Sequence, residues 1–339
     1  MEGPVQLRDV AAFAGRMEMR LFESELLKGN PLGDPHLREV PIYIPPDTRA
    51  PLPVIFLLSG FSGRGQAMTE THPWKRGVLA DFDRAVAAEE VPPAILVAPD
   101  CFTRLGGSQY VNSSATGPYR DHVAGELVDL IDENYDTLPG RRAVCGKSSG
   151  GFGALHLAMH HPDIFPVAAS ISGDCAFDLG HVNSFPAALR GLIEHDGDPA
   201  RFLAAFESDP SLSGDGHALI DLLAMSACYS PNADAPLGFD LPVTLDTCEL
   251  IDEVWQRWLA FDPLRACAAH AEALAGLDLL HIECGDRDEF HLQYGLRRLA
   301  TRLTELGISF SKEEFPAGHF DINHRYGLLL PRLVHALTA

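Results

Sequence analysis

The stretch Gly146-Lys147-Ser148-Ser149-Gly150 decides the fold class of this chain of 339 residues. The preceding run, residues 142–145, is apolar and has the composition of a buried strand. The following run, residues 151–159, is rich in small and apolar residues and favours a helix. G-x-S-x-G between a strand and a helix is a nucleophile elbow, a sharp turn that exposes a serine above the sheet. Glycines flank the turn because larger side chains would clash there. The pattern predicts Ser148 as a nucleophile.

Two later segments supply the other members of a Ser-acid-His triad, in the chain order that α/β-hydrolases use. A strand-like run at 279–284 ends in the acidic loop 285–290, and an alternating run at 308–315 ends in a turn that presents a histidine. A serine hydroxyl is a weak nucleophile, so it needs a histidine as general base and a buried carboxylate that orients the imidazole. We therefore predict a catalytic triad of Ser148, Asp288 and His319.

Each of these assignments has an alternative in the sequence. The acidic loop also contains Asp286 and Glu289, and Asp286 is the stronger rival as the triad acid. His324 is the alternative base, but it falls at the predicted start of the last helix. Ser149 lacks a glycine two positions before it. We expect its backbone N–H to matter more than its hydroxyl.

Acyl transfer also needs hydrogen-bond donors for the oxygen that becomes negative in the tetrahedral intermediate. The apolar run 53–58 is typical of a central parallel strand, and it ends in the glycine-rich loop 59–65. α/β-Hydrolases take one oxyanion N–H from such a loop and the other from the residue after the nucleophile. We therefore predict an oxyanion hole made by Phe61 and Ser149. The loop has neither a P-loop nor a dinucleotide-binding pattern, so a nucleotide is not expected.

The composition restricts the partners and the compartment. Asp and Glu number 47 against 26 Lys and Arg, which gives a formal charge of −21 and disfavours nucleic acid and anionic membranes. No apolar stretch is long enough to span a bilayer, and residues 1–9 lack a signal-peptide pattern. The seven cysteines form no C-x-x-C pair, so we expect reduced thiols in the cytoplasm. We expect no metal and no other cofactor, since no cluster has metal-ligand spacing.

The order of the predicted elements indicates an α/β fold. Two antiparallel runs at 17–27 and 39–44 come first, and strands then alternate with helices, which predicts a mostly parallel central sheet with helices on both faces. Between residues 175 and 261 the alternation gives way to short helical pieces and proline-rich turns. We predict an α/β-hydrolase catalytic domain formed by residues 1–174 and 262–339, with 175–261 inserted as a helical cap.

These motifs carry a family resemblance. The chain resembles the Putative esterase family of α/β-hydrolases, which includes esterase D (S-formylglutathione hydrolase), enterochelin esterases, feruloyl esterases and mycolyltransferases. The resemblance rests on residues 57–61, the elbow at 146–150, residues 285–288 and 318–319. It implies the same triad of nucleophile, acid and base. Residues 104–113 resemble the pocket-lining loop of the bacterial members. The resemblance thus implies that substrate contacts are made by Gly60, Gln109, Tyr110 and Asn112.

The triad predicts a serine carboxylic-ester hydrolase that acts through an acyl-enzyme on small or medium acyl esters. An acyltransferase or thioesterase with the same triad is the alternative, because only the acceptor or the leaving atom differs. Residues 309–312 match the S-x-x-K of β-lactamase-type esterases, but they alternate like a strand. A non-catalytic binding protein would not need all three triad residue types. We expect a small-molecule ester as partner, and the sequence is compatible with a homo-oligomer.

The predicted cap contains many large apolar residues, most of which we expect to form its own core. Acyl pockets are lined mainly by apolar and aromatic side chains, so part of the cap should face the nucleophile. Residues 229–239 are proline-rich and irregular, and we predict that this stretch approaches Ser148 and narrows the entrance.

Overall fold

The computed structural model describes residues 13–46, 50–69 and 77–339. Residues 1–9, on which part of the predicted location rests, lie outside the described residues. Eight of the described strands form one large sheet, in which the β1–β2 and β2–β4 pairs are antiparallel and the remaining pairs are parallel. In spatial order the strands are β1 (Arg16–Glu23), β2 (Leu37–Ile44), β4 (Ile95–Val97), β3 (Leu52–Leu58), β7 (Thr137–Lys147), β8 (Val167–Ile171), β9 (Leu279–Gly285) and β10 (Ser311–Phe315).

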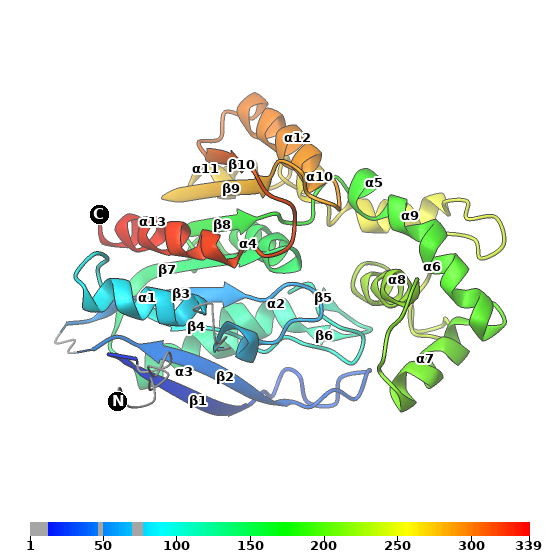
Figure 1. Ribbon diagram of the computed structural model, residues 1–339, viewed down its shortest axis with the longest axis horizontal. Coiled ribbons are helices and arrows are strands. Elements are labelled where there is room, and N and C mark those ends of the chain that lie inside the picture. Colours follow the sequence, from blue (N-terminus) through cyan, green and yellow to red (C-terminus); the bar gives the residue numbers. More distant parts are fainter. Residues whose placement is uncertain (1–12, 47–49, 70–76) are drawn as a thin grey trace, which may run out of the picture.

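Helices cover both faces of this sheet (Figure 1). One face packs against α1 (Val78–Ala87) and α13 (Tyr326–Thr338). The other packs against α3 (Leu127–Asn134), α4 (Ser149–His160) and α12 (Leu292–Glu305). The shorter elements of this part are η1 (Gly65–Thr69), α2 (Tyr119–Asp121), α10 (Pro263–Ala266), α11 (Ala271–Ala275), η5 (Asn323–Arg325) and the hairpin of β5 (Asn112–Ser113) and β6 (Gly117–Pro118).

The central strands are apolar on both faces because helices cover both. Every residue of β3 and of β8 is buried. Alternate residues of β3 enter opposite cores, with Phe56 packed under α4 and Ile55 under α1 and α13. This two-sided burial explains the continuous apolar runs of the sequence, and it confirms the predicted α/β fold with a mostly parallel sheet.

The segment that leads into α3 forms one π-helical turn, His122–Glu126. One predicted element differs in detail from the observed one. The expected strand at 308–315 is shorter, since β10 begins only at Ser311. Ile308 follows the turn that closes α12, where its N–H donates to the carbonyl of Leu303 at 3.0 Å and its side chain is buried in the core. Alternation alone does not distinguish such a helix end from the first residues of a strand.

Residues 175–261, which we call the cap segment, lie between β8 and β9 in the sequence and consist of helices and turns. Figure 1 shows these helices grouped to one side of the sheet. Their apolar residues form a separate core that includes Trp255, Trp258 and Tyr229. The elements are α5 (Phe177–Gly180), η3 (Val182–Ser184), α6 (Phe185–Gly191), η4 (Leu192–His195), α7 (Pro199–Ser208), α8 (Gly216–Tyr229) and α9 (Asp252–Leu259).

The two ends of the cap segment are tied together by one buried carboxylate. Asp262 accepts the backbone N–H groups of Ala176 at 2.9 Å and Phe177 at 3.1 Å, and it also caps α10 through the N–H of Leu264. The side chain is fully buried. The chain therefore leaves the sheet and returns to it at nearly the same place.

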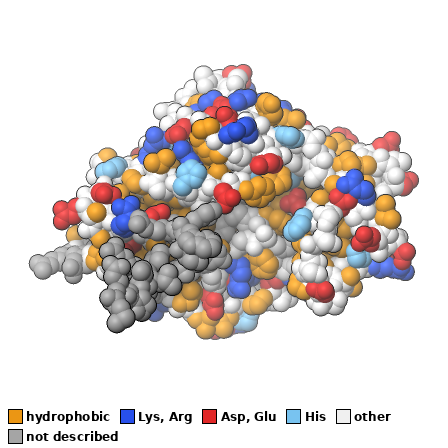
Figure 2. Space-filling model, viewed as in Figure 1, with side chains coloured by type: hydrophobic (Ala, Val, Ile, Leu, Met, Phe, Trp, Pro, Cys, Tyr) orange, Lys and Arg blue, Asp and Glu red, His pale blue; other side chains and the backbone are white. Residues whose placement is uncertain are grey.

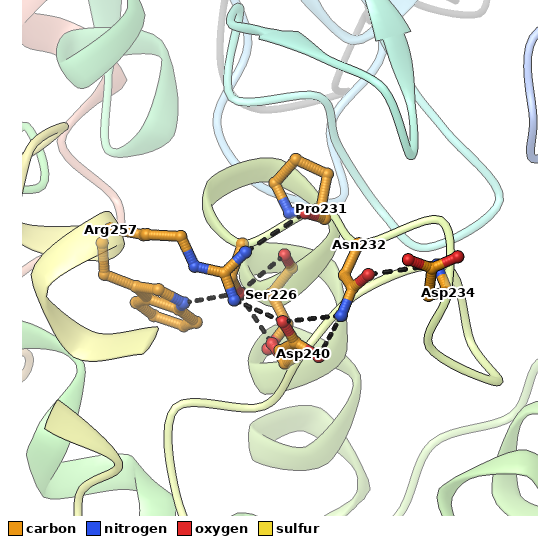
Figure 3. Close-up of polar contacts among 8 residues, drawn as sticks. Ser226, Pro231, Asn232, Asp234, Asp240 and Arg257 are labelled. Carbon is orange, nitrogen blue, oxygen red and sulfur yellow. Dashed lines mark hydrogen bonds and ion pairs between the residues drawn. The ribbon is translucent and has the colours of Figure 1, made fainter. Parts of the chain in front are cut away.

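The irregular loop after α8 is held to α9 by polar contacts (Figure 3). Arg257 pairs with Asp240 and donates to the carbonyl of Pro231 at 3.2 Å, and Asn232 donates to both oxygens of Asp240, at 2.9 and 3.1 Å. At the base of the loop, Trp258 Nε1 donates to Ser230 Oγ at 2.9 Å. These contacts fix the loop within the cap segment.

Candidate active site

The nucleophile candidate Ser148 lies in a turn between β7 and α4. Its backbone is strained, with φ 58° and ψ −126°. The flanking glycines are required by space. A Cβ atom at Gly150 would lie 2.1 Å from the carbonyl oxygen of Leu58, and one at Gly146 would lie 2.5 Å from the backbone of Gly150. The strand-turn-helix context expected from the sequence is therefore present, and it presents the hydroxyl of Ser148 at the end of the sheet.

His319 connects Ser148 to Asp288. Its Nε2 lies 3.0 Å from Ser148 Oγ, and its Nδ1 lies 2.8 Å from Asp288 Oδ2. Only 4 % of His319 and 2 % of Asp288 are exposed. The second oxygen of Asp288 accepts the N–H of Phe290 at 2.9 Å, and the thiol of Cys284 lies 3.8 Å from Oδ2. A buried carboxylate fixed in this way can hold the imidazole in one orientation.

The alternative acids and base take other positions. Asp286 is exposed and pairs with Arg287 at 3.3 Å, and His324 is exposed and contacts the carbonyl of Asp321 at 3.3 Å. Glu289 has a role that the sequence did not indicate: its Oε2 accepts the backbone N–H of His319 at 2.6 Å. An acidic loop residue carries no sequence signal for this contact, because the contact depends on how two distant loops meet.

The predicted oxyanion loop lies directly beside the nucleophile. A Cβ atom placed on Gly60 would be 3.3 Å from Ser148 Cβ and 4.0 Å from its Oγ, so the loop that carries Phe61 passes close to Ser148. The loop is fixed by the N–H of Ser62, which donates to the carbonyl of Gly106 at 2.7 Å. The Phe61 ring packs over Gly106, where a Cβ atom would lie 2.7 Å from the ring. Gly106 has φ +113°, so glycine is needed for both reasons.

The other predicted substrate residues, Gln109, Tyr110 and Asn112, already have partners within the protein. The Tyr110 hydroxyl donates to the carbonyl of Ser59 at 2.7 Å and so supports the oxyanion loop. Asn112 accepts the backbone N–H of Asp121 at 3.2 Å. Gln109 is the one whose amide reaches the residue after the nucleophile indirectly, through Asp174.

A second polar group lies behind Ser149, and the sequence analysis missed it. Asp174, three residues after the end of β8, accepts hydrogen bonds from Ser149 Oγ at 3.1 Å and from Gln109 Nε2 at 3.3 Å. Burial and the charge of Asp174 raise the pKa of Asp221 on α8 to about 7. His181 lies 3.9 Å from Asp221. These residues come from separate elements, and no local pattern in the sequence connects them.

Aromatic side chains surround the catalytic histidine candidate on its exposed side. The Phe290 ring meets the imidazole of His319 edge to face, with centroids 4.7 Å apart, and the Phe320 ring lies 5.4 Å from it. Phe290 is 46 % exposed and Phe320 is 60 % exposed. Exposed aromatic rings at a reactive centre offer an apolar contact surface for a ligand.

Two further ionisable groups near the sheet end bear on the electrostatics. Burial lowers the pKa of Lys147, and the carboxylates of Asp288, Asp321 and Glu289 oppose this shift. A lysine inside the elbow thus places a cation close to the acidic loop. Burial also raises the pKa of Cys284 well above its ordinary value, so this neighbour of Asp288 remains a neutral thiol.

Within the described ranges, one group of three side chains has the proximity of metal ligands: His281, Glu283 and Glu313. Arginines already occupy it. Arg325 pairs with Glu283 at 2.6 Å and with Glu313 at 2.7 Å, and Arg332 Nη1 lies 2.8 Å from a ring nitrogen of His281. The guanidinium groups take the place that a metal cation would need, so this cluster is an ion-pair network.

The surface charge and the apolar character of the helices bear on possible partners. Acidic and basic side chains are interspersed over the face shown in Figure 2. Of the helices in the described residues, none has the length and apolar character needed to cross a membrane.

Comparisons with known proteins place this geometry in a family. The family model described as "Putative esterase" matches residues 35–305. Among curated proteins, the MPT51/MPB51 antigen of Mycobacterium tuberculosis is 38 % identical over 68 residues, which cover 20 % of this chain and 23 % of that protein. The match therefore spans less than a quarter of the length of that relative.

Solved structures share the fold over nearly the whole chain. A ferulic acid esterase superposes with a TM-score of 0.60 at 17 % identity, covering 96 % of this chain and 99 % of the other. An S-formylglutathione hydrolase from Agrobacterium tumefaciens gives 0.57 at 18 % identity, covering 96 % and 97 %. The family model covers most of the chain, and these structures share its α/β-hydrolase fold. The chain belongs to the Putative esterase family.

Proposed function

We propose that this protein is a serine hydrolase that cleaves carboxylic esters through an acyl-enzyme intermediate. The observation that carries the proposal is the position of His319, with one ring nitrogen 3.0 Å from Ser148 Oγ and the other 2.8 Å from Asp288. Nucleophile, base and orienting acid within hydrogen-bond reach of one another are what acyl transfer requires.

In the first half of the reaction, Ser148 Oγ attacks the ester carbonyl and its proton passes to His319 Nε2. Asp288 stabilises the imidazolium and holds its Nδ1–H. The carbonyl oxygen becomes negative and accepts the backbone N–H groups of Phe61 and Ser149. The C–O bond to the alcohol then breaks, and the alcohol leaves with the proton from His319.

In the second half, a water molecule replaces the alcohol. His319 takes a proton from this water as it attacks the acyl carbon, and the tetrahedral intermediate collapses to release the acid and regenerate Ser148. No step needs a metal or another cofactor. The strained backbone of Ser148 and the hydrogen bond from the Phe290 N–H to Asp288 hold the reacting groups in place before substrate binds.

The cap segment supplies one wall of the substrate site in this proposal. α8 reaches the loop beside the nucleophile through Met225, whose sulfur lies 2.6 Å from Gln109 Nε2. Tyr229 packs edge to face on Phe152 of α4, with centroids 5.8 Å apart. Of the predicted stretch 229–239, Tyr229 is thus the residue whose contacts reach α4, while the following loop is bound to α9. We propose that α8 limits the length of the acyl group.

The proposal is tested with a fluorophosphonate probe and a panel of p-nitrophenyl esters of increasing acyl length, with one thioester. Wild-type protein and Ser149→Ala should be labelled and should release p-nitrophenol, whereas Ser148→Ala should do neither. Labelling that persists in Ser148→Ala would place the nucleophile elsewhere. Faster turnover in the presence of an added alcohol, with a new ester as product, would make the protein an acyltransferase instead.

A further inference from the structure

Two carboxylates lie behind the residue that follows the nucleophile. Asp174 accepts hydrogen bonds from the Ser149 hydroxyl and the Gln109 amide, and both bonds go to the same oxygen, Oδ2. Its other oxygen accepts no hydrogen bond within the described ranges. Asp221 lies on α8 one helical turn before Met225, whose sulfur lies 2.6 Å from the same Gln109 amide nitrogen that donates to Asp174. The pair thus lies between the sheet end and the cap segment, beside the proposed reaction centre.

No basic side chain balances this pair. Elsewhere, acids of the cap segment are matched by arginines: Asp178 pairs with Arg298 at 3.0 Å and Asp215 with Arg190. Within the described part of the chain, neither Asp174 nor Asp221 has a lysine or arginine partner within 4.0 Å. The nearest ring nitrogen is that of His181, at 3.9 Å from Asp221. Burial lowers the pKa of His181, so this histidine is neutral at pH 7.

Unused polar atoms surround the pair. Gln109 Oε1, the Tyr229 hydroxyl and His181 Nε2 are buried and have no hydrogen-bond partner in the described structure. Gln109 is 2 % exposed and Tyr229 is 1 % exposed. The Gln109 amide lies against Asp174, since its nitrogen donates to Oδ2. The His181 ring lies 3.9 Å from Asp221 and packs on the Tyr229 ring, with centroids 6.3 Å apart. Buried polar atoms are normally satisfied, so atoms left free around an uncompensated charge are typical of a site that a ligand completes.

The backbone at this place is strained as well. Gln109 and Tyr110 are consecutive non-glycine residues with φ 52° and 56°. Two left-handed residues in a row are unfavourable unless the surroundings enforce them, and such strain gathers at functional sites. Here the hydrogen bond from Tyr110 to Ser59 and the contacts of Gln109 with Asp174 and Met225 hold the conformation.

We propose that Asp174 and Asp221 form a subsite for a positively charged group of the ester substrate, a protonated amine or a quaternary ammonium. The inference rests on the proposed function, because it assigns specificity to that same site. Asp174, together with Asp221 in its ionised form, supplies the charge, and Gln109 Oε1 and the Tyr229 hydroxyl supply acceptors for any N–H of the group. Since Ser149 contacts Asp174 and adjoins Ser148, the cationic group would lie a few bonds from the reacting carbonyl.

A matched pair of substrates tests this. The p-nitrophenyl esters of 4-(trimethylammonio)butyrate and 5,5-dimethylhexanoate have the same shape and differ in one charge. The measured quantity is the ratio of their kcat/KM values in the full-length protein. We expect wild type to favour the charged ester by about tenfold or more, which corresponds to about 1.4 kcal/mol. Asp174→Asn and Asp221→Asn should each lower this ratio severalfold.

The net charge of the protein also attracts cations, so a control must separate that effect. Asp178→Asn removes one charge from the same cap segment, at an exposed position, and should leave the ratio unchanged. If Asp178→Asn lowers the ratio as strongly as Asp174→Asn does, the preference for the charged ester comes from the net negative charge of the protein. That result would overturn the subsite. Equal kcat/KM values for the two esters in wild type would overturn it too, while Ser148-dependent cleavage of the neutral ester would leave the proposed function standing.

A binding measurement covers the case in which neither ester is cleaved. Calorimetric titration of wild type with butyltrimethylammonium chloride should show binding that Asp174→Asn weakens at least fivefold. The uncharged control ligand is 5,5-dimethylhexanol. Cation binding without hydrolysis would refute the proposed function and keep the subsite. Equal binding to wild type and Asp174→Asn would refute the subsite.

Discussion

Replacing Asp288 by asparagine tests how the triad is held. The N–H of Phe290 donates to Asp288 Oδ1 at 2.9 Å, so an asparagine must keep its carbonyl oxygen on that side. Its NH₂ group then faces His319 Nδ1 across the present 2.8 Å contact. An NH₂ donor forces Nδ1 to be the acceptor and puts the proton on Nε2, where it blocks proton transfer from Ser148.

We expect Asp288→Asn to lower kcat about 10⁴-fold, as the same change does in a related triad. This corresponds to about 5 kcal/mol of lost transition-state stabilisation. KM should change little, because the carboxylate does not touch substrate. The assay is hydrolysis of p-nitrophenyl acetate, with the rate of fluorophosphonate labelling as a second readout, since labelling needs the same activated hydroxyl.

Asp286→Asn is the matched control, with the same chemical change two residues away. The side chain of Asp286 is 44 % exposed and its carboxylate pairs with the exposed Arg287, so we expect less than about a threefold effect on kcat. Thermal unfolding of both variants checks that the fold is kept. A loss below about tenfold in Asp288→Asn, or a larger loss in Asp286→Asn, would refute the assignment of the acid and the orientation argument with it.

Four further outcomes are expected. Ser148→Ala should lose about 10⁶-fold in kcat with its unfolding temperature nearly unchanged, whereas Ser149→Ala should keep most of the activity, and equal losses would contradict the nucleophile assignment. Gly150→Ala should cost about 1–3 kcal/mol or more in urea unfolding, because its methyl group would overlap the neighbouring strand. Burial and a neighbouring carboxylate raise the pKa of Asp221 to about 7, so its ionised form destabilises the fold increasingly as the pH rises towards 7. Asp221→Asn should therefore have a free energy of unfolding about 2 kcal/mol higher than wild type at pH 8, and this gain should shrink towards pH 4. The figure is about half of the free energy that the pKa shift alone implies, because 27 % of the side chain is exposed to solvent. A gain independent of pH would speak against the shifted carboxyl. Met225→Ala should move the preferred acyl length of the p-nitrophenyl ester panel upwards, and an unchanged length profile would exclude a role of α8 in limiting the acyl group.

Much of the geometry of the candidate site could be predicted because it depends on local patterns. The elbow needs small residues at fixed spacing, and Gly146 and Gly150 occupy space that no side chain could fill. The acid and base follow strands whose apolar pattern is visible in the sequence. The contact of Glu289 with the backbone of His319, and the Asp174–Asp221 pair, were not predictable in this way. These contacts form where loops and helices from distant parts of the chain meet, and the local sequence pattern does not indicate which distant segments meet.

The carboxylate of Asp262, which joins the departing and returning ends of the cap segment, has a consequence for how this protein can change over time. Because the two ends are fixed next to each other, insertions, deletions or replacement of the 175–261 stretch need not disturb the strands on either side. The proposed reacting groups Ser148, Asp288 and His319 all lie outside that stretch. A lineage could therefore exchange the cap segment as a unit without moving these three side chains, and a laboratory could graft another segment between Ala176 and Asp262 in the same way.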